Sequence, residues 1–268
     1  MKQLGFYLIF TKEERIMRKH DKVPATSGQV GEIAGALVGE MNFSKDEAKA
    51  IIGEMGTFRR DVRRFYQQYR NNMIVDFSAD LDRWVAVYGK LFGQNQKPNL
   101  SGIHIPKRPE NVGPARLIVV VHELIKWSGN YGPLQGVQEA LKEHFPCWQY
   151  SSDLDKEITT NDRDLRTGSY AVWVRDVREA DEDLKNLSAH DLAEQKISGI
   201  VTLERQLLEA DYFFEKKEHL DQQNRTLCSG SRDRGGGVPR ADWDDLFGIG
   251  WYDPSHCGPG LRSRRVWA

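Results

Sequence analysis

Residues 228–268 read CSGSRDRGGGVPRADWDDLFGIGWYDPSHCGPGLRSRRVWA, and their composition differs from everything before them. Gly- and Pro-containing turns separate short apolar runs, which predicts short strands around Trp243 and Trp251. A last strand over 262–267 is expected to return and pair near the start of the same domain. The stretch contains no Lys, Glu, Gln, Met or Asn, whereas residues 1–227 hold 16 Lys, 18 Glu and 13 Gln.

Two interpretations of this bias compete. A Gly-rich surface loop region can avoid long flexible side chains, and exposed polar loops of this kind are common. Alternatively, the bias reflects mutated codons. An Asn codon that ends in a pyrimidine and is randomised at its first two bases encodes Asp, Gly, Ser, Arg, His, Cys or Tyr, among others. It cannot encode Lys, Glu, Gln, Met or Trp, although the lack of Asn counts mildly against this interpretation.

Several segments resemble the variable proteins of diversity-generating retroelements, as found in candidate-phylum bacteria. They are RLIVVVHEL, FPCWQYSSDLDK, YAVWVRDVREADEDLKNLSA, ISGIVTLERQLLEADYF, HLDQQNRTLCSGSR, GGGVP and WYDP…LRSR, and together they cover roughly residues 102–268. In those systems a reverse transcriptase copies a template repeat with errors at adenines, and the cDNA replaces the 3′ end of a target gene. The resemblance implies a C-type-lectin-like fold that displays diversified residues, and it implies no particular biochemical activity.

The resemblance also implies that the contact residues for an unknown protein or other macromolecular ligand lie in residues 228–268. We expect Tyr252 and Arg234 to be anchors, because aromatic and Arg side chains dominate binding hot spots. The tryptophans and glycines are expected to be scaffold, with Gly supplying turns of positive φ. The full expected contact set is Asp233, Arg234, Arg240, Asp242, Asp244, Asp245, Phe247, Tyr252, Asp253, Ser255, His256 and Cys257.

Residues 116–268 are predicted to form one α+β domain. The β-branched run Arg116–Val121 is typical of a buried strand, and Gly168–Val177 alternates as a second strand. Helices are predicted over Gly136–His144, after a cap at Ser188, and over Ile200–Phe214 with one apolar stripe.

Residues 1–95 are predicted to form a separate helical domain that includes a helix over Ala79–Leu91. Prolines 98, 106, 109 and 114 make residues 96–115 a stiff linker, which places the domain boundary near residue 100. The predicted fold is therefore an N-terminal helical bundle followed by a C-type-lectin-like α+β domain. One helix carries Arg59, Arg60, Arg63 and Arg64, which can contact nucleic acid or simply form a solvated face.

Composition limits the classes of partner. The formal net charge of -1 gives no general attraction to nucleic acid or anionic membranes. No apolar run approaches the ~20 residues of a spanning helix, so no membrane partner is expected. Three cysteines that are far apart in sequence indicate a reduced, cytoplasmic protein rather than a disulfide framework.

Catalytic and metal-binding patterns are weak. The residues Cys228, His219, His256 and Cys257 lack zinc-site spacing, and the pair at His122 and Glu123 lacks the second His of a zincin helix. An acidic cluster, Asp153, Asp155, Asp162 and Asp164, is compatible with calcium or with ordinary solvated loop acids. We expect a binding protein that is not an enzyme and uses no cofactor. The alternative is a nucleic-acid-binding or enzymatic accessory protein of a mobile element.

Overall fold

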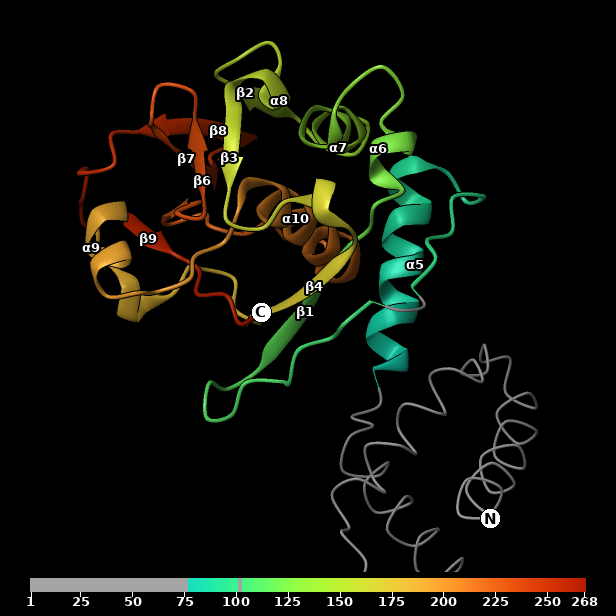
Figure 1. The fold of residues 1–268 in the computed structure, drawn as a ribbon, viewed down its shortest axis with the longest axis horizontal. Coiled ribbons are helices and arrows are strands. Elements are labelled where there is room, and N and C mark those ends of the chain that lie inside the picture. Colours follow the sequence, from blue (N-terminus) through green and yellow to red (C-terminus); the bar gives the residue numbers. More distant parts are fainter. Residues whose placement is uncertain (1–76, 101–102) are drawn as a thin grey trace, which may run out of the picture. The chain divides into compact units, whose positions relative to one another are not determined.

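The computed structural model describes residues 77–100 and 103–268 (Figure 1). The chain divides into two compact units, Met1–Phe77 and Ser78–Ala268, and only the second is described in detail below. The predicted helices before residue 77, with Arg59, Arg60, Arg63 and Arg64, lie outside the described residues. Among the described helices, none is long and apolar enough to cross a membrane.

Helix α5, Ser78–Phe92, begins the second unit and corrects the predicted domain boundary. Its fully buried Trp84 donates a hydrogen bond from Nε1 to the carbonyl of Leu117 at 2.7 Å, and the Tyr88 hydroxyl donates to the carbonyl of Val119 at 2.6 Å. The sequence predicts this helix correctly, but helical periodicity does not show against which domain its apolar face packs. The boundary lies after Phe77, and the Pro-rich stretch connects two elements of the same unit.

The strands of the α+β unit form three sheets. In the first, β1 (Ala115–Val120) pairs antiparallel with β4 (Tyr170–Arg175), and both runs were predicted to be strands. A second two-stranded sheet joins β3 (Ile158–Asn161) to β6 (Ser231–Asp233). The largest sheet has the order β2-β8-β7-β5-β9, with bounds Cys147–Gln149, Phe247–Tyr252, Val238–Trp243, Arg225–Leu227 and Leu261–Ser263.

The C-terminal residues return to the first sheet, but the strand predicted over 262–267 forms only in part, because β9 ends at Ser263 and pairs with β5. Trp267 and Trp173 exchange two backbone hydrogen bonds, of 2.9 and 3.0 Å, next to strand β4. Short helices connect the strands: α6 (Leu124–Trp127), α7 (Pro133–Lys142), α8 (Leu154–Glu157), η2 (Leu165–Thr167), η3 (Glu182–Leu184) and α9 (Ala189–Glu194). The predicted cap of α9 is present as a capping box between Ser188 and Asp191.

Helix α10, Thr202–Lys216, lies in the middle of the unit in Figure 1 and is buried on almost every side. The sequence predicts one buried apolar stripe, yet Glu204, Arg205, Glu209 and Asp211 are also at most 1% exposed. Each has a charged partner. Glu204 binds Arg163 through two hydrogen bonds, and Asp211 binds Arg83 and Arg116. A buried charge is tolerated when it is paired in this way.

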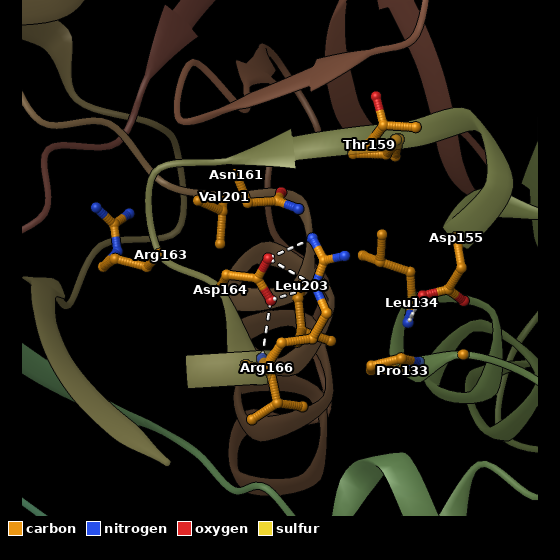
Figure 2. A pocket seen from close by; sticks show the side chains of 13 residues that line it. Pro133, Leu134, Asp155, Thr159, Asn161, Arg163, Asp164, Arg166, Val201 and Leu203 are labelled. Carbon is orange, nitrogen blue, oxygen red and sulfur yellow. Dashed lines mark hydrogen bonds and ion pairs between the residues drawn. The ribbon is translucent and has the colours of Figure 1, made fainter. Parts of the chain in front are cut away.

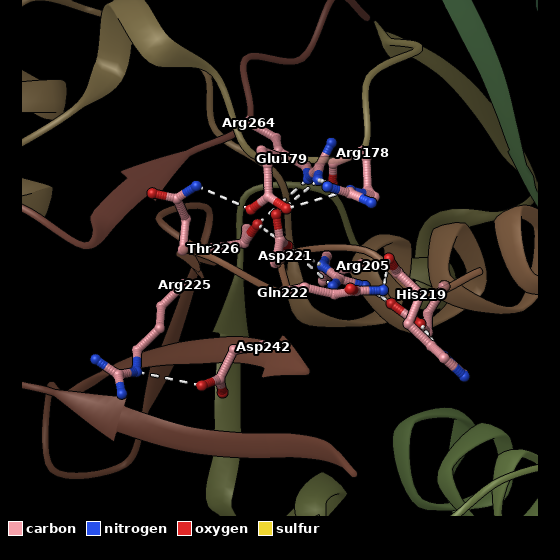
Figure 3. A network of polar contacts seen from close by, with 12 residues as sticks. Arg178, Glu179, Arg205, His219, Asp221, Gln222, Arg225, Thr226, Asp242 and Arg264 are labelled. Atoms are coloured by element: carbon pink, nitrogen blue, oxygen red, sulfur yellow. Dashed lines mark hydrogen bonds and ion pairs between the residues drawn. The ribbon is translucent and has the colours of Figure 1, made fainter. Parts of the chain in front are cut away.

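The middle of α10 belongs to a buried network that we call the inner network: Arg205, Glu209, Asp221, Thr226 and Arg264 (Figure 3). Arg205 donates to Glu209 at 2.8 Å and to Asp221 at 3.0 Å, and Arg264 donates to the other oxygen of Asp221 at 2.7 Å. Burial alone raises the pKa of Asp221, but the two guanidinium groups outweigh burial and hold this pKa below its usual value. The carboxylate is therefore charged at neutral pH and ties β5 and the C-terminal segment to α10.

Candidate ligand-binding face

Strands β7 and β8 bring predicted contact residues onto one face of the largest sheet. In their antiparallel register Asp242 lies opposite Gly248, Arg240 opposite Gly250, and Val238 opposite Tyr252. Residues directly opposite each other share a face of the sheet, so Arg240, Asp242 and Tyr252 lie on the same side. The alternate residues Ala241, Phe247 and Ile249 point into the core and are at most 1% exposed.

The neighbouring strands extend this face in both directions. On one side, Leu227 of β5 pairs with Arg240, which places Arg225 on the same face beside Asp242. On the other side, Trp148 of β2 pairs in parallel register with Gly248 and is 48% exposed. We call this surface the outer face, and it consists of Trp148, Arg225, Arg240, Asp242, Gly248, Gly250 and Tyr252.

Helix α9 and the η3 turn cover the remainder of the same side of the sheet. Leu227, Val238 and Leu261 form an apolar cluster with Leu184 and Leu192, and Tyr252 packs at its margin. This cluster fixes the backbone of β5, β7 and β9 next to the outer face. The outer face is therefore a polar, partly exposed area at the edge of a packed apolar layer.

Two guanidinium groups share one carboxylate at the centre of the outer face. The Nε of Arg225 donates to Asp242 Oδ2 at 3.2 Å, and Arg240 donates to Asp242 Oδ1. Burial lowers the pKa of Arg240, and the nearby charge of Arg225 lowers it further, but an Arg side chain remains protonated at neutral pH. The guanidinium of Arg240 also lies 5.9 Å from the ring of Tyr252, which stacks on His256.

The glycines of β8 provide space rather than turns. A Cβ atom on Gly250 would lie 2.8 Å from the Nε of Arg240, so this glycine allows the guanidinium to lie across the strand. The sequence predicts that glycines here serve positive φ, but among residues 228–268 only Gly236 does so, with φ +88°. At Gly250 the missing side chain matters because Arg240 approaches the backbone closely.

Most of the other predicted contact residues are exposed in loops at the ends of β7 and β8. Asp244 and Asp245 form the hairpin between the two strands. Arg234 lies before β7, has a 70% exposed side chain, and pairs with Glu157 at 3.2 Å. The exposed residues after β8 are Asp253, Ser255, His256 and Cys257.

The structure removes two predicted residues from the contact set. Phe247 is fully buried and its ring meets that of Phe145, so it belongs to the core. Asp233 is 8% exposed, and one of its carboxylate oxygens accepts hydrogen bonds from the backbone amides of Gly235 and Gly237. An Asp that binds amides a few residues ahead is a known turn signal, so the sequence DRGGG already contained this information.

The tryptophans also depart from the expected scaffold role. Trp243 is half-buried and stacks on His219, which fits that role. Trp251 is instead 53% exposed. The compositional bias gives no indication of Trp148, because this residue lies outside the biased stretch. Its only signal is its place in the FPCWQYS segment that carries the resemblance.

A separate cavity of about 330 Å³ lies between the start of α7, strand β3 and the loop before η2 (Figure 2). Its acidic side chains are already bonded to the protein. The carboxylate of Asp155 accepts the amides of Leu134 and Gln135, and Asp164 pairs with Arg166. Asp153 likewise caps α8. These members of the predicted acidic cluster act as helix caps, and no group of three or more His, Cys, Asp or Glu among the described residues could hold a metal ion.

The residues considered for a zinc site do not share one environment. Burial raises the pKa of the Cys228 thiol to about 12, and the Nδ1 of His219 lies 2.9 Å from Glu209. Cys147 is half-buried, and burial raises its pKa to about 12 as well, whereas Cys257 is exposed. All three cysteines are free thiols. A buried thiol with a raised pKa is a poor nucleophile, because the thiolate is the reactive form.

Comparison of the chain with protein-family models, with curated proteins and with solved structures finds no match.

Proposed function

We propose that this chain is a variable protein of a diversity-generating retroelement that binds a protein or other macromolecular ligand. The proposal joins the resemblance over residues 102–268 to the compositional bias of residues 228–268. The observation that carries it is that alternate residues of β7 and β8 lie on opposite faces of the sheet and differ in burial. Arg240, Asp242 and Tyr252 share the outer face, while Ala241, Phe247 and Ile249 fill the core.

This difference in burial allows the proposed contact residues to change without loss of the fold. The core beneath the sheet is formed by α10 and by the inner network, most of which precedes residue 228. A rigid scaffold with exchangeable surface side chains is the usual design of a diversified binder. The contact set becomes Arg240 and Tyr252 on the sheet with Arg234, Asp244, Asp245, Asp253, Ser255, His256 and Cys257 in the loops, and Asp242 holds the arginines.

The extent of this set favours a macromolecule as the ligand. The exposed loops lie at both ends of the β7–β8 pair, because Tyr252 is opposite Val238 and Trp243 is opposite Phe247. Small-molecule sites are concave and enclose their ligands, whereas protein partners cover extended surfaces. We also propose a C-type-lectin-like arrangement, which the return of Trp267 to strand β4 supports.

Deep sequencing of the 3′ end of this gene across its natural population tests the proposal, with the upstream part of the gene as the control. We expect substitutions to concentrate at Asn-type codons between residues 233 and 258. Within that window they should fall on the exposed positions and spare Phe247, Asp233 and Trp243. A 3′ end as invariant as the upstream part would overturn the proposal.

A further inference from the structure

The arginine pair of the outer face has unused hydrogen-bonding capacity. Arg225 and Arg240 each bind one oxygen of Asp242, so the two guanidinium groups share this carboxylate. Within the part of the chain that the structure describes, the terminal nitrogens of Arg225 and the Nε of Arg240 donate no hydrogen bond. The side chain of Arg225 is 47% exposed. The cluster has two positive charges and one negative charge, and its free donors suit a further carboxylate.

An exposed aromatic side chain lies on the same face near this cluster. Trp148, Gly248 and Asp242 occupy neighbouring positions on three adjacent strands, β2, β8 and β7. Adjacent strands are about 4.8 Å apart, so the backbones at Trp148 and Asp242 are separated by about 10 Å. Gly248 has no side chain between them. An exposed aromatic ring and a cationic cluster thus lie in one row across the sheet, with the buried backbone of Gly248 between them.

We propose that the outer face docks an acidic segment of a partner protein. A carboxylate of the segment binds Arg225 and Arg240, and an apolar side chain of the same segment rests on Trp148. Trp148 and Arg225 are three strand spacings, about 14 Å, apart, and extended chain rises by about 3.3 Å per residue. The acidic and apolar residues of the segment are therefore about four positions apart, which also places them on the same side of the extended chain. This inference rests on the proposed function, and it names the partner chemistry of that same site.

The charges around the outer face orient the segment. The exposed hairpin residues Asp244 and Asp245 follow β7 directly after Trp243 and repel an acidic group from that end. The carboxylate is therefore held on the side of β5, at Arg225. Both Arg225 and Trp148 precede residue 228, so they stay constant when the proposed variable stretch changes. The acidic preference is then common to all variants of the protein, while Arg240 and Tyr252 adjust the remaining contacts.

The test is selection of a phage-displayed library of random peptides on the full chain. We expect enriched peptides to carry Asp or Glu about four positions from an aromatic or aliphatic residue. Synthetic versions of these peptides should lose about tenfold in affinity on Arg225→Gln or Trp148→Ala, the size of one charged hydrogen bond or one anchor. Replacing the acidic residue of the peptide by its amide should cause a similar loss.

Two matched variants control for general effects. Arg178→Gln removes an arginine outside the outer face whose side chain is 40% exposed, and Trp251→Ala removes a Trp that is also about half exposed. Both should leave peptide affinity within about twofold of the original, because neither side chain belongs to the proposed contact. Circular dichroism of every variant should match that of the unaltered chain.

The outcomes separate this inference from the proposed function. Peptides without acidic residues that still depend on Trp148 would overturn the acidic class of partner. Peptides that are indifferent to both Trp148→Ala and Arg225→Gln, or a library that yields none, would overturn docking at the outer face. Neither result bears on the 3′ sequencing experiment, whose outcome alone judges whether the chain is diversified.

Discussion

The inner network and the outer face contain the same chemical groups in different surroundings, and Figure 3 shows part of both. Each places two arginines around one aspartate: Arg205 and Arg264 around Asp221 inside, Arg225 and Arg240 around Asp242 outside. Both carboxylates are buried, Asp221 fully and Asp242 with 7% exposure, but Arg264 is 1% exposed whereas the side chain of Arg225 is 47% exposed. The comparison indicates that a fully buried cluster of this kind stabilises the fold, whereas a partly exposed one can bind a partner.

The largest expected effect comes from removing the two aspartates in turn. Asp221→Ala leaves Arg205 and Arg264 buried without their shared partner, which we expect to cost about 3–5 kcal/mol of unfolding free energy. Asp242→Ala is the matched variant and should cost about 1 kcal/mol, because water can reach the outer arginines. Urea unfolding measures both values. Equal costs would show that exposure does not distinguish the two clusters.

The second comparison concerns two aromatic residues of the same strand. Phe247→Ala creates a cavity in the core and should cost about 3–5 kcal/mol. Tyr252→Ala removes a partly exposed ring and should cost about 1 kcal/mol while it weakens ligand binding. Thermal unfolding of the two variants checks the prediction. A large loss of stability for Tyr252→Ala would show that Tyr252 belongs to the core instead.

Acid should weaken the inner network. The pKa of Asp221 is lowered below its ordinary value of 3.8, so its contribution to stability is complete above that value. The contribution is lost as the pH falls through the lowered pKa in the folded protein. Urea unfolding at a series of pH values should therefore show a steeper decline below pH 4 for the unaltered chain than for Asp221→Asn. Parallel curves would mean that Asp221 has the same pKa in the folded and unfolded states.

The smallest expected effects distinguish two glycines. Gly236→Ala forces a side chain into positive φ and should cost about 1 kcal/mol. Gly250→Ala meets only the movable side chain of Arg240, so it should cost less in stability. It should nevertheless shift the Nε–H resonance of Arg240 in an NMR spectrum, because the guanidinium must leave its position over the strand. An unchanged resonance would contradict the packing of Arg240 on Gly250.

Sequence patterns predicted the helices and strands better than the burial of their side chains. Strands β1, β4, β7 and β8, the cap of α9 and helix α10 all follow from local periodicity and capping residues. Local patterns could not predict that the charges of α10 are buried, because Asp211 of this helix is paired with Arg116, 95 residues away. For the same reason the contact set included Phe247 and omitted Trp148. Whether a strand residue faces the core depends on register with a partner strand, and a single sequence does not fix that register.

Under the proposed function, the return of the C-terminal residues to the middle of the protein would make the fold depend on every exchanged 3′ sequence. Arg264 reaches Asp221, Val266 donates to the carbonyl of Ser198, and Trp267 pairs with Trp173. A replacement copied in the wrong reading frame, or with a premature stop, loses all three attachments at once. Under that proposal such a product would leave α10 and β4 uncovered and open to proteases, so that only in-frame variants accumulate.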